Sequence, residues 1–406
     1  MSSSGRVPRL LGRARRLTRN RDAIIYAILI AGVFIVPAIA NFTQGTSSGV
    51  VLDQVANAGV FVLLAIGLNI VVGFAGLLDL GYAAFFAIGA YTYAMLGSGW
   101  LDVTAIHHAV HIPFWILLFV GMGLAALFGL ILGAPTLRLR GDYLAIVTLG
   151  FGEIVPRIFR IKIEWTGGIN GITALDQPTL PVWLTGPWAG QDFALTRNQV
   201  FGLDPVPYYV LIVMLIAVSV VLATNLYRSR LGRAWMAIRE DEVAAAAMGV
   251  NPVIIKLLAF SIGASFSGFA GVFFAAKLGG IDPTLFGFQN VSIVILVMVV
   301  LGGMGNISGV IVGAIGVYFL QNVIIPQLPI WTTGAASSIG LSFLNNPNGD
   351  WAGLGDEVQR LNFIIFGLIL VGTMLFRPQG LFPSQLRQAE LTKGTSDQSV
   401  FDASTS

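Results

Sequence analysis

The chain has 406 residues, of which 55% are hydrophobic and 11% are charged. A typical soluble domain contains about 25% charged residues, so the composition excludes a soluble protein and predicts an all-α polytopic membrane protein. The formal net charge of +3 is small, and the basic residues stand in short clusters beside apolar runs. This pattern argues against nucleic acid as a partner. The chain contains no cysteine, which excludes disulfides and thiolate sites.

The first 22 residues form a basic segment. Positions 1–21 contain seven arginines and no acidic residue, and an apolar run follows at 23–40. Residues 38–40 resemble the cleavage site of a signal peptide, but the apolar run is longer than a typical signal core. We therefore expect a cytoplasmic basic flank followed by a first membrane span.

Further apolar runs predict about ten transmembrane or re-entrant helices in total, because each run is long enough to cross or enter a bilayer. They lie at 50–72, 81–97, 113–136, 142–162, 206–226, 256–276, 289–303, 307–326 and 361–376. The membrane domain is thus expected at 23–383, with polar outer loops at 98–112, 163–205 and 327–360. A polar tail at 384–406 is expected to be disordered.

The distribution of basic residues predicts the orientation. If the N-terminus is inside, 17 of the 23 Lys and Arg fall on the cytoplasmic side under alternating topology. This agrees with the excess of Lys and Arg in cytoplasmic loops. We therefore expect both termini, and the charged loop 227–256, in the cytoplasm.

The central charged stretch runs from Leu231 to Pro252 and reads LGRAWMAIREDEVAAAAMGVNP. Its alanines, acids and methionine favour an unbroken helix from Arg239 to Met248. Gly249 can end this helix, and the following Asn-Pro pair stops it. Charged residues at the front and small residues at the back predict a short docking helix.

Two glycine-rich segments interrupt the apolar runs, at 73–81 (GFAGLLDLG) and at 302–309 (GGMGNISG). Broken helices at membrane depth survive where they face protein or water, so such segments often line a transport path. Tight helical hairpins are an equally good interpretation. We call these segments the first break and the second break.

Seven stretches resemble LivM-type permeases of branched-chain amino-acid importers of the ATP-binding-cassette class. They are LNIVVGFAGLLDLGYAAFFAIGAY (68–91), LRLRGDYLAIVTLGFGEIVPRI (137–158), WTGGINGI (165–172), AIREDEVAAAAMGVNP (237–252), KLLAFSIGASFSGFAGVFFA (256–275), VLGGMGNISGVIVGA (300–314) and FRPQGLF (376–382). Residues 176–205 and 327–360 show the least resemblance.

The resemblance implies a permease that pairs with a second homologous permease, two ATPase subunits that use ATP and Mg, and an extracytoplasmic solute-binding protein. Membrane lipid surrounds such a subunit, which lies in the plasma or inner membrane. Ala244, Ala245 and Gly249 match the spacing of the cytoplasmic motif that docks the ATPase, while Glu242 stands one place before the motif's glutamate. The expected coupling residues are Arg239, Glu240, Asp241, Glu242, Ala244, Ala245 and Gly249.

The chain itself contains no Gly-Lys dipeptide, so it lacks a Walker A phosphate loop. No nucleophile and base are arranged as in an enzyme. We therefore expect a non-enzymatic subunit that moves branched-chain or other apolar amino acids by alternating access. A urea or short-amide importer is the first alternative, an ion-coupled secondary transporter is the second, and a membrane scaffold fits poorly.

Four polar residues are candidates for the translocation path. Glu153 lies within a predicted span, where an ionisable group is costly, although an i,i+4 pair with Arg157 explains it structurally. Asn69 and Asp79 border the first break, and Asn290 lies near the outer mouth of the seventh and eighth spans. Helix caps and loop contacts explain these three equally well.

The histidines at 107, 108 and 111 cluster in one outer loop. With no cysteine and one nearby acid, a metal site is not expected there. Solvated loop histidines are the favoured interpretation.

Overall fold

The computed structural model describes residues 31–32, 46–104, 107, 110–136, 142–181, 198–202, 204–341, 353–376 and 380–382. The predicted basic segment 1–22, the predicted tail 384–406 and most of the first predicted span lie outside these residues. The chain divides into two compact units, one of residues 1–56 with 179–214 and one of residues 57–178 with 215–406. The larger unit contains both breaks and the central charged stretch.

Every apolar run predicted from 50–72 onward coincides with a helix. The long helices are α2 (Thr46–Leu68), α3 (Tyr82–Leu96), α5 (Phe114–Thr136), α6 (Asp142–Ile161), α9 (Pro205–Arg228), α12 (Pro252–Leu278), α13 (Ser292–Gly302), α14 (Ile307–Phe319), α15 (Ile325–Ser338) and α17 (Asn362–Phe376). Shorter elements are α4 (Trp100–Val103), α7 (Ile163–Thr166), α10 (Arg230–Glu240), α11 (Glu242–Ala247), α16 (Leu354–Arg360), the π-helices η1 (Asn69–Phe74) and η4 (Leu320–Ile324), and the 3₁₀-helices η2 (Gly168–Asn170) and η3 (Pro283–Phe286).

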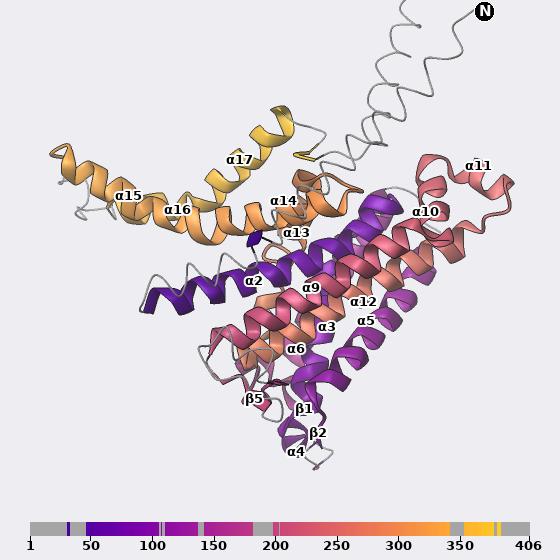
Figure 1. Cartoon of the computed structure of the whole chain (residues 1–406), viewed down its shortest axis with the longest axis horizontal. Helices are drawn as coiled ribbons and strands as arrows, with labels where there is room; N and C mark the ends of the chain where they lie inside the picture. The colour runs from indigo at the N-terminus through magenta and orange to yellow at the C-terminus, as the bar shows by residue number, and fades with distance from the viewer. Residues whose placement is uncertain are drawn as a thin grey trace, which may run out of the picture. The chain divides into compact units, whose positions relative to one another are not determined.

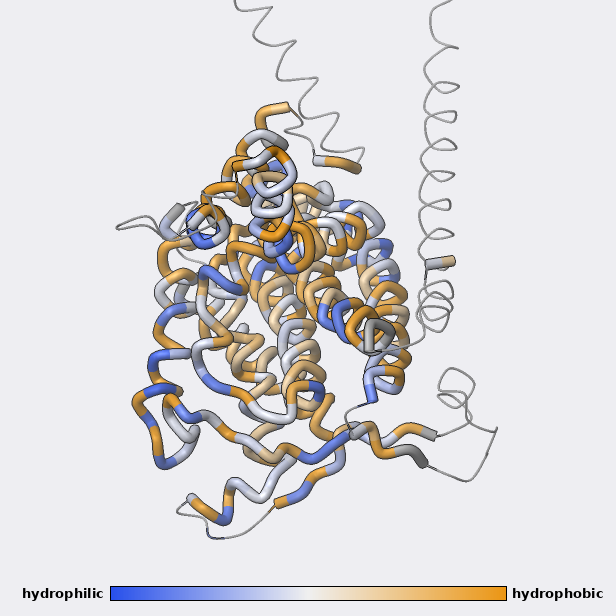
Figure 2. Tube along the Cα trace, turned by 90° about the vertical axis from the view of Figure 1, so that its left-hand side faces the viewer, coloured by the Kyte–Doolittle hydropathy of each residue, from blue (hydrophilic) through white to orange (hydrophobic). Residues whose placement is uncertain are grey.

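Five of the described helical segments are long and apolar enough to cross a membrane. They are Gly49–Phe74, Phe114–Pro135, Pro205–Arg228, Pro252–Leu278 and Ile307–Ser338. The helices Tyr82–Leu96 and Ser292–Gly302 are apolar but shorter. Figure 2 shows hydrophobic residues along most of the helical segments and hydrophilic residues gathered in the connecting loops. The chain is therefore a helical, multi-pass membrane protein.

Helix α12 is the centre of the larger unit and packs against α3 and α5 (Figure 1). Small residues allow this close packing: a Cβ placed on Gly89 of α3 would lie 2.2 Å from the carbonyl oxygen of Gly268 in α12. Likewise, a Cβ on Gly129 of α5 would lie 2.9 Å from the Cβ of Ala264 in α12. Close backbone approach of this kind is how membrane helices associate.

The second break is a tight helical hairpin, which confirms one of the two interpretations offered for it. Helices α13 and α14 pack against each other, and a Cβ on Gly313 would lie 2.5 Å from the Cα of Gly302. The segment 380–382 closes this turn, because the amides of Leu381 and Phe382 donate to the carbonyls of Leu301 (2.7 Å) and Gly302 (3.2 Å).

After α14 the helix continues through η4 and α15 to Ser338, past the predicted span end at 326. The sequence looked polar here because of its threonines and serines. Their hydroxyls bond back to helix carbonyls, as Thr332 does to Leu328 (2.9 Å) and Ser337 does to Thr333 (2.9 Å). Such bonds satisfy the polar groups within the helix. The outer stretch predicted at 327–360 is therefore helical over its first third.

Within the described residues, the loops contain three short antiparallel strand pairs. Strand β1 (Gly97–Ser98) pairs with β2 (Val110–His111), and β3 (Ile172–Thr173) pairs with β6 (Gly280–Ile281). In the smaller unit, β4 (Thr179–Pro181) pairs with β5 (Asn198–Val200), and Leu52 buries against Tyr209.

Figure 1 shows α10 and α11 at one end of α12 and α5, and β1, β2 and α4 at the opposite end. The predicted cytoplasmic loop and the first predicted outer loop are thus far apart.

Candidate functional site

Helix α10 is fixed to the start of α12. Ser229 caps its N-terminus, where the hydroxyl accepts a bond from the amide of Gly232 (3.2 Å). Trp235 is fully buried, and its indole Nε1 donates to the carbonyl of Ile255 (2.7 Å). A buried tryptophan with a satisfied N–H is a strong anchor. Helix α10 is therefore held against α12 by one large side chain.

The predicted unbroken helix from Arg239 to Met248 is wrong, because it ends and restarts at Asp241. The backbone of Asp241 is extended, and its carboxylate accepts bonds from the amides of Val243 (2.8 Å) and Ala244 (3.0 Å). Aspartate offers the backbone this local bond in place of a helical one, which is why it favours the N-cap. Two short helices, α10 and α11, replace one.

The predicted end of the helix at Gly249 is confirmed. Gly249 has a φ of +88°, and its amide donates to Ala246 (3.0 Å) while the amide of Val250 donates to Ala245 (3.1 Å). This bond pattern is a Schellman motif, which favours glycine at the left-handed position. Asn251 then caps α12.

Helix α11 presents apolar side chains to the surroundings. Val243 is 76% exposed and Met248 is 86% exposed, and Ala244 is also exposed. Ala245 is only 5% exposed, so its predicted contact with a docking partner is corrected: it packs within the chain. Ala245 faces inward because α11 turns one side toward α12.

The acidic residues of the coupling set differ in their roles. Glu240 and Asp241 are exposed. Glu242 forms an ion pair with Lys256 of α12, with 2.7 Å between Oε1 and Nζ. The stem of Lys256 is largely covered, so this pair holds α11 to α12 while leaving the acidic front of α11 accessible.

Arg239 points inward, away from the exposed acids. Its guanidinium donates to the carbonyl of Gly73 in η1, and its stem lies over the first break, where a Cβ on Gly76 would be 2.8 Å from the Cγ of Arg239. Gly76 has a φ of +70°, which glycine adopts without strain. No sequence motif predicts this contact, since the two residues lie 166 positions apart.

Asn69 joins the first break to the second. It is 1% exposed, and its Oδ1 accepts a bond from the amide of Gly305 (2.8 Å). Gly73 leaves the space for this bond: a Cβ there would lie 2.1 Å from Asn69 Oδ1 and 2.6 Å from the amide nitrogen of Gly305. This bond therefore ties the first break to the second break.

Asp79 lies in the loop of the first break and is buried. Its Oδ1 accepts a bond from the amide of Gly81 (2.9 Å), while the neighbouring Leu80 amide donates to Thr148 of α6 (3.1 Å). Asn290 is exposed at the turn before α13. The structure thus does not bring the four predicted path residues to one place.

Glu153 lies on the exposed side of α6. Its Oε2 is 3.9 Å from the guanidinium of Arg157, the predicted i,i+4 partner, and both side chains are substantially exposed in the isolated chain. The same side of α6 carries exposed Tyr143, Ile146, Ile154, Ile158 and Ile161. This stripe is mostly apolar, and its charged residues are the ion pair and the exposed Arg160.

The chain matches the model of the family described as branched-chain amino acid transport system / permease component over residues 50–374. The chain belongs to this family. It is 38% identical over 344 residues to the high-affinity branched-chain amino acid transport system permease protein LivM of Escherichia coli, covering 82% of this chain and 70% of that protein. The corresponding LivM of Salmonella typhimurium is 37% identical over 349 residues, with the same shares covered.

A more distant relative is the autoinducer 2 import system permease protein LsrC of Salmonella paratyphi B, which is 28% identical over 182 residues, or 42% of this chain and 45% of LsrC. No solved structure matches the chain significantly. The chain is the membrane permease subunit of an ATP-binding-cassette importer and a multi-pass plasma membrane protein. Membership of the family implies an ATPase and a solute-binding protein as partners.

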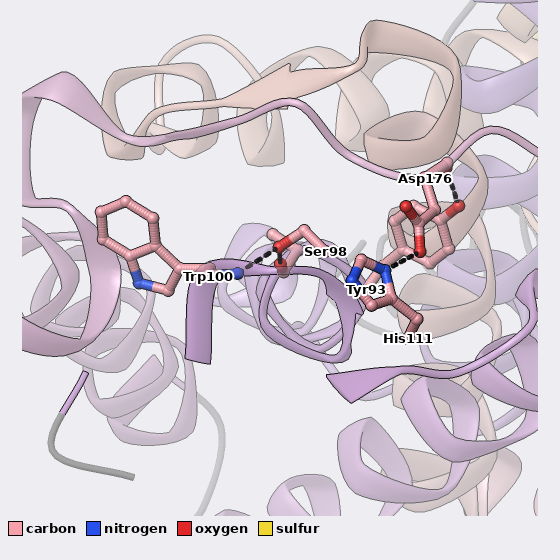
Figure 3. Close-up of polar contacts among 6 residues, drawn as sticks. Tyr93, Ser98, Trp100, His111 and Asp176 are labelled. Atoms are coloured by element: carbon pink, nitrogen blue, oxygen red, sulfur yellow. Dashed lines mark hydrogen bonds and ion pairs between the residues drawn. The ribbon is translucent and has the colours of Figure 1, made fainter. Parts of the chain in front are cut away.

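The two loops predicted to be outer, 98–112 and 163–205, are tied together at Asp176. Figure 3 shows His111 and Tyr93 converging on this residue: His111 Nδ1 lies 2.7 Å from Asp176 Oδ2, and the Tyr93 hydroxyl donates to the Asp176 carbonyl. The Asp176 amide donates to Gly97 (2.8 Å). His108 lies outside the described residues, and no group of three metal-ligating side chains occurs within them.

Proposed function

We propose that this permease imports branched-chain amino acids and is driven through the exposed face of α11. About ten helices with both termini in the cytoplasm would form the membrane domain, together with a second homologous permease. Two ATPase subunits, which bind ATP with Mg, would supply the energy. The names of the two LivM relatives support the solute, and the excess of Lys and Arg in the predicted inner loops supports the orientation.

The exposed face of α11 is the observation that carries the docking role. Val243 and Met248 leave 76% and 86% of their surface exposed, outside any membrane-spanning helix. Exposed apolar side chains beside acidic ones, here Glu240 and Asp241, are typical of a surface that a partner covers. Figure 1 places α11 at the end of the larger unit opposite the outer strands β1 and β2.

Substitution of this face tests the docking role. In the complete importer, Val243→Asp with Met248→Asp should abolish ATPase binding and reduce uptake by about 100-fold, because apolar anchors at interfaces each contribute about 1–3 kcal/mol. Val103→Asp is the matched control, since Val103 is 72% exposed but lies in α4 at the opposite end. Co-purification and uptake measure the result; normal ATPase binding by the double variant would reject this docking face.

Uptake by the purified importer in liposomes tests the solute and the energy source. Radiolabelled leucine, isoleucine and valine should enter only when ATP is present on the ATPase side, and labelled urea should not. Entry of urea in preference to leucine would support the short-amide alternative. Uptake driven by a proton or sodium gradient without any ATPase would reject the ATP-driven assignment.

We further propose that the exposed stripe of α6 meets the second permease and lines the translocation path. An ion pair such as Glu153 with Arg157 is costly against lipid, so this face is expected to meet protein or water. The chain has no cysteine, which makes single introduced cysteines informative. Ile146→Cys should react with a hydrophilic thiol reagent, whereas Leu127→Cys, on an exposed side of α5, should not. Equal reactivity would argue against the path assignment.

A further inference from the structure

We infer that Arg239 is a positioning residue that transmits the movement of α10 to both breaks at once. This inference rests on the proposed docking of an ATPase at α11. The contact runs from Arg239 to the carbonyl of Gly73, along one turn of η1 to Asn69, and from Asn69 to the amide of Gly305. We call these four residues the break junction. They come from three segments that are remote in the sequence.

The first link joins the predicted cytoplasmic stretch to the first break. Arg239 follows Ile238 at the end of α10, one residue before the acids that face outward. Its charged donor meets a backbone carbonyl, which is stronger than a neutral pair. Because the stem also lies over Gly76, the arginine follows any displacement of the break by contact as well as by hydrogen bonding.

The carbonyl of Gly73 is accessible because η1 is a π-helix. A π-helical turn carries an i→i+5 bond and an additional residue, and such turns occur frequently at functional sites. Here the i→i+5 bond runs from the amide of Ala75 to the carbonyl of Ile70 (3.3 Å), and the next bond, from the amide of Leu77 to the carbonyl of Val71 (3.1 Å), spans six residues. Gly73 therefore contacts both Arg239, through its carbonyl, and the backbone of Gly305.

The second link joins the two breaks. The Asn69 side chain holds Gly305 through Oδ1, yet its Nδ2 is buried with no hydrogen-bond partner in the part of the chain that the structure describes. Buried polar groups are ordinarily satisfied. We take this unbonded donor as the group that gains a partner when the junction changes its arrangement.

The chemistry of the contact explains the residue types. Glycine at 73 allows an arginine, an asparagine and a second backbone to meet within one turn, because any Cβ there would overlap Asn69 and Gly305. Arginine reaches the carbonyl with a rigid planar donor. Asparagine provides an acceptor without introducing a charge at a buried position.

The test uses the complete importer in liposomes and measures ATP hydrolysis and uptake together. Arg239→Ala should leave ATPase binding and hydrolysis in place while the uptake per ATP falls about 10- to 100-fold, since losing a hydrogen bond to a charged group costs about 1.5–3 kcal/mol. Arg239→Lys should retain part of the uptake per ATP, because lysine also offers a charged donor. Arg233→Ala, an exposed position on the same helix, should leave uptake per ATP unchanged. An Arg239→Ala importer with normal uptake per ATP would overturn the inference.

Substitutions of Asn69 provide a second test of the break junction. Asn69→Asp keeps the acceptor for Gly305, and Asn69→Leu removes it, so uptake per ATP should fall further in Asn69→Leu. Combined with Arg239→Ala, Asn69→Leu should add little, because both substitutions break one path; additive losses would mean two independent structural roles and would reject the inference. If the importer without substitutions shows no ATP-driven uptake, the proposed function is rejected. If it shows such uptake but the variants behave normally, only the role of the break junction is rejected.

Discussion

The two breaks are alike in sequence and different in structure. The second break is held by its own hairpin, in which α13 and α14 meet at Gly302 and Gly313 and the segment 380–382 closes the turn. The first break is held by side chains from elsewhere, by Arg239 and by Thr148. The structural role of a glycine-rich segment is therefore determined by the elements that pack against it, and not by its own sequence. The second break has a hairpin of its own, whereas the first break depends on side chains from other elements.

The largest expected effect comes from filling the space where the breaks meet. Gly73→Ala places a Cβ 2.1 Å from Asn69 Oδ1, and overpacking a buried site costs about 1–3 kcal/mol. We expect uptake to fall about 100-fold or more, measured in liposomes. Gly316→Ala is the matched control, since a Cβ there meets nothing within 4 Å. If both variants transport equally, the first break is not a moving part.

A smaller effect, on stability, is expected in the hairpin. Gly313→Ala places a Cβ 2.5 Å from the Cα of Gly302, and overpacking of this kind destabilises by about 1–3 kcal/mol. The thermal unfolding midpoint in detergent should fall, while uptake per ATP of the surviving protein should remain normal. A normal midpoint with altered coupling would reverse the roles assigned to the two breaks.

Removing one polar side chain of the second break, with its two hydrogen bonds, should have a moderate effect on stability. Asn306 donates to the carbonyl of Phe382 (3.0 Å) and accepts from the hydroxyl of Ser308 (2.8 Å). Asn306→Ala should lower stability by about 1 kcal/mol, measured by thermal unfolding. The exposed Asn290→Ala should change stability by less than about 0.5 kcal/mol. Equal effects would show that residue 382 does not hold the turn.

The smallest effect is expected at Glu153, which belongs to neither break. Its pair with Arg157 is long, at 3.9 Å, and both side chains are substantially exposed in the isolated chain. Exposed pairs contribute about 0–1 kcal/mol. Glu153→Gln should therefore leave the unfolding midpoint of the isolated subunit nearly unchanged. A large loss of stability would show that the pair is buried within this subunit after all.

The sequence predicted the membrane class and the positions of the helices well. Long apolar runs leave few alternatives at membrane depth, because backbone groups must be satisfied within each segment. The helix stop at Gly249 was also predictable, since a local motif determines it. The prediction was wrong at 327–338. The threonines and serines there indicated a polar loop, but their hydroxyls donate to carbonyls of the same helix.

The candidate site was predicted less well than the fold. Asp241 interrupts the docking helix because one local capping bond outweighs the helix propensity of the alanines around it. Ala245 and Arg239 were both predicted as coupling residues; Ala245 is buried, and Arg239 contacts Gly73 of the first break. These outcomes depend on which side of a short helix meets the rest of the chain. No pattern within the stretch itself carries that information.

Helix α11 is only six residues long, and isolated helices shorter than about 12–15 residues are marginal in water. Its shape is imposed by Asp241 at one end, the turn at Gly249 at the other and the tie from Glu242 to Lys256. A synthetic peptide of residues 237–252 would lack Lys256 and therefore the ion pair with Glu242, and we expect it to be largely unfolded in water. Such a peptide would be a poor competitive inhibitor of the importer, and drug design against this surface would need a stapled mimic.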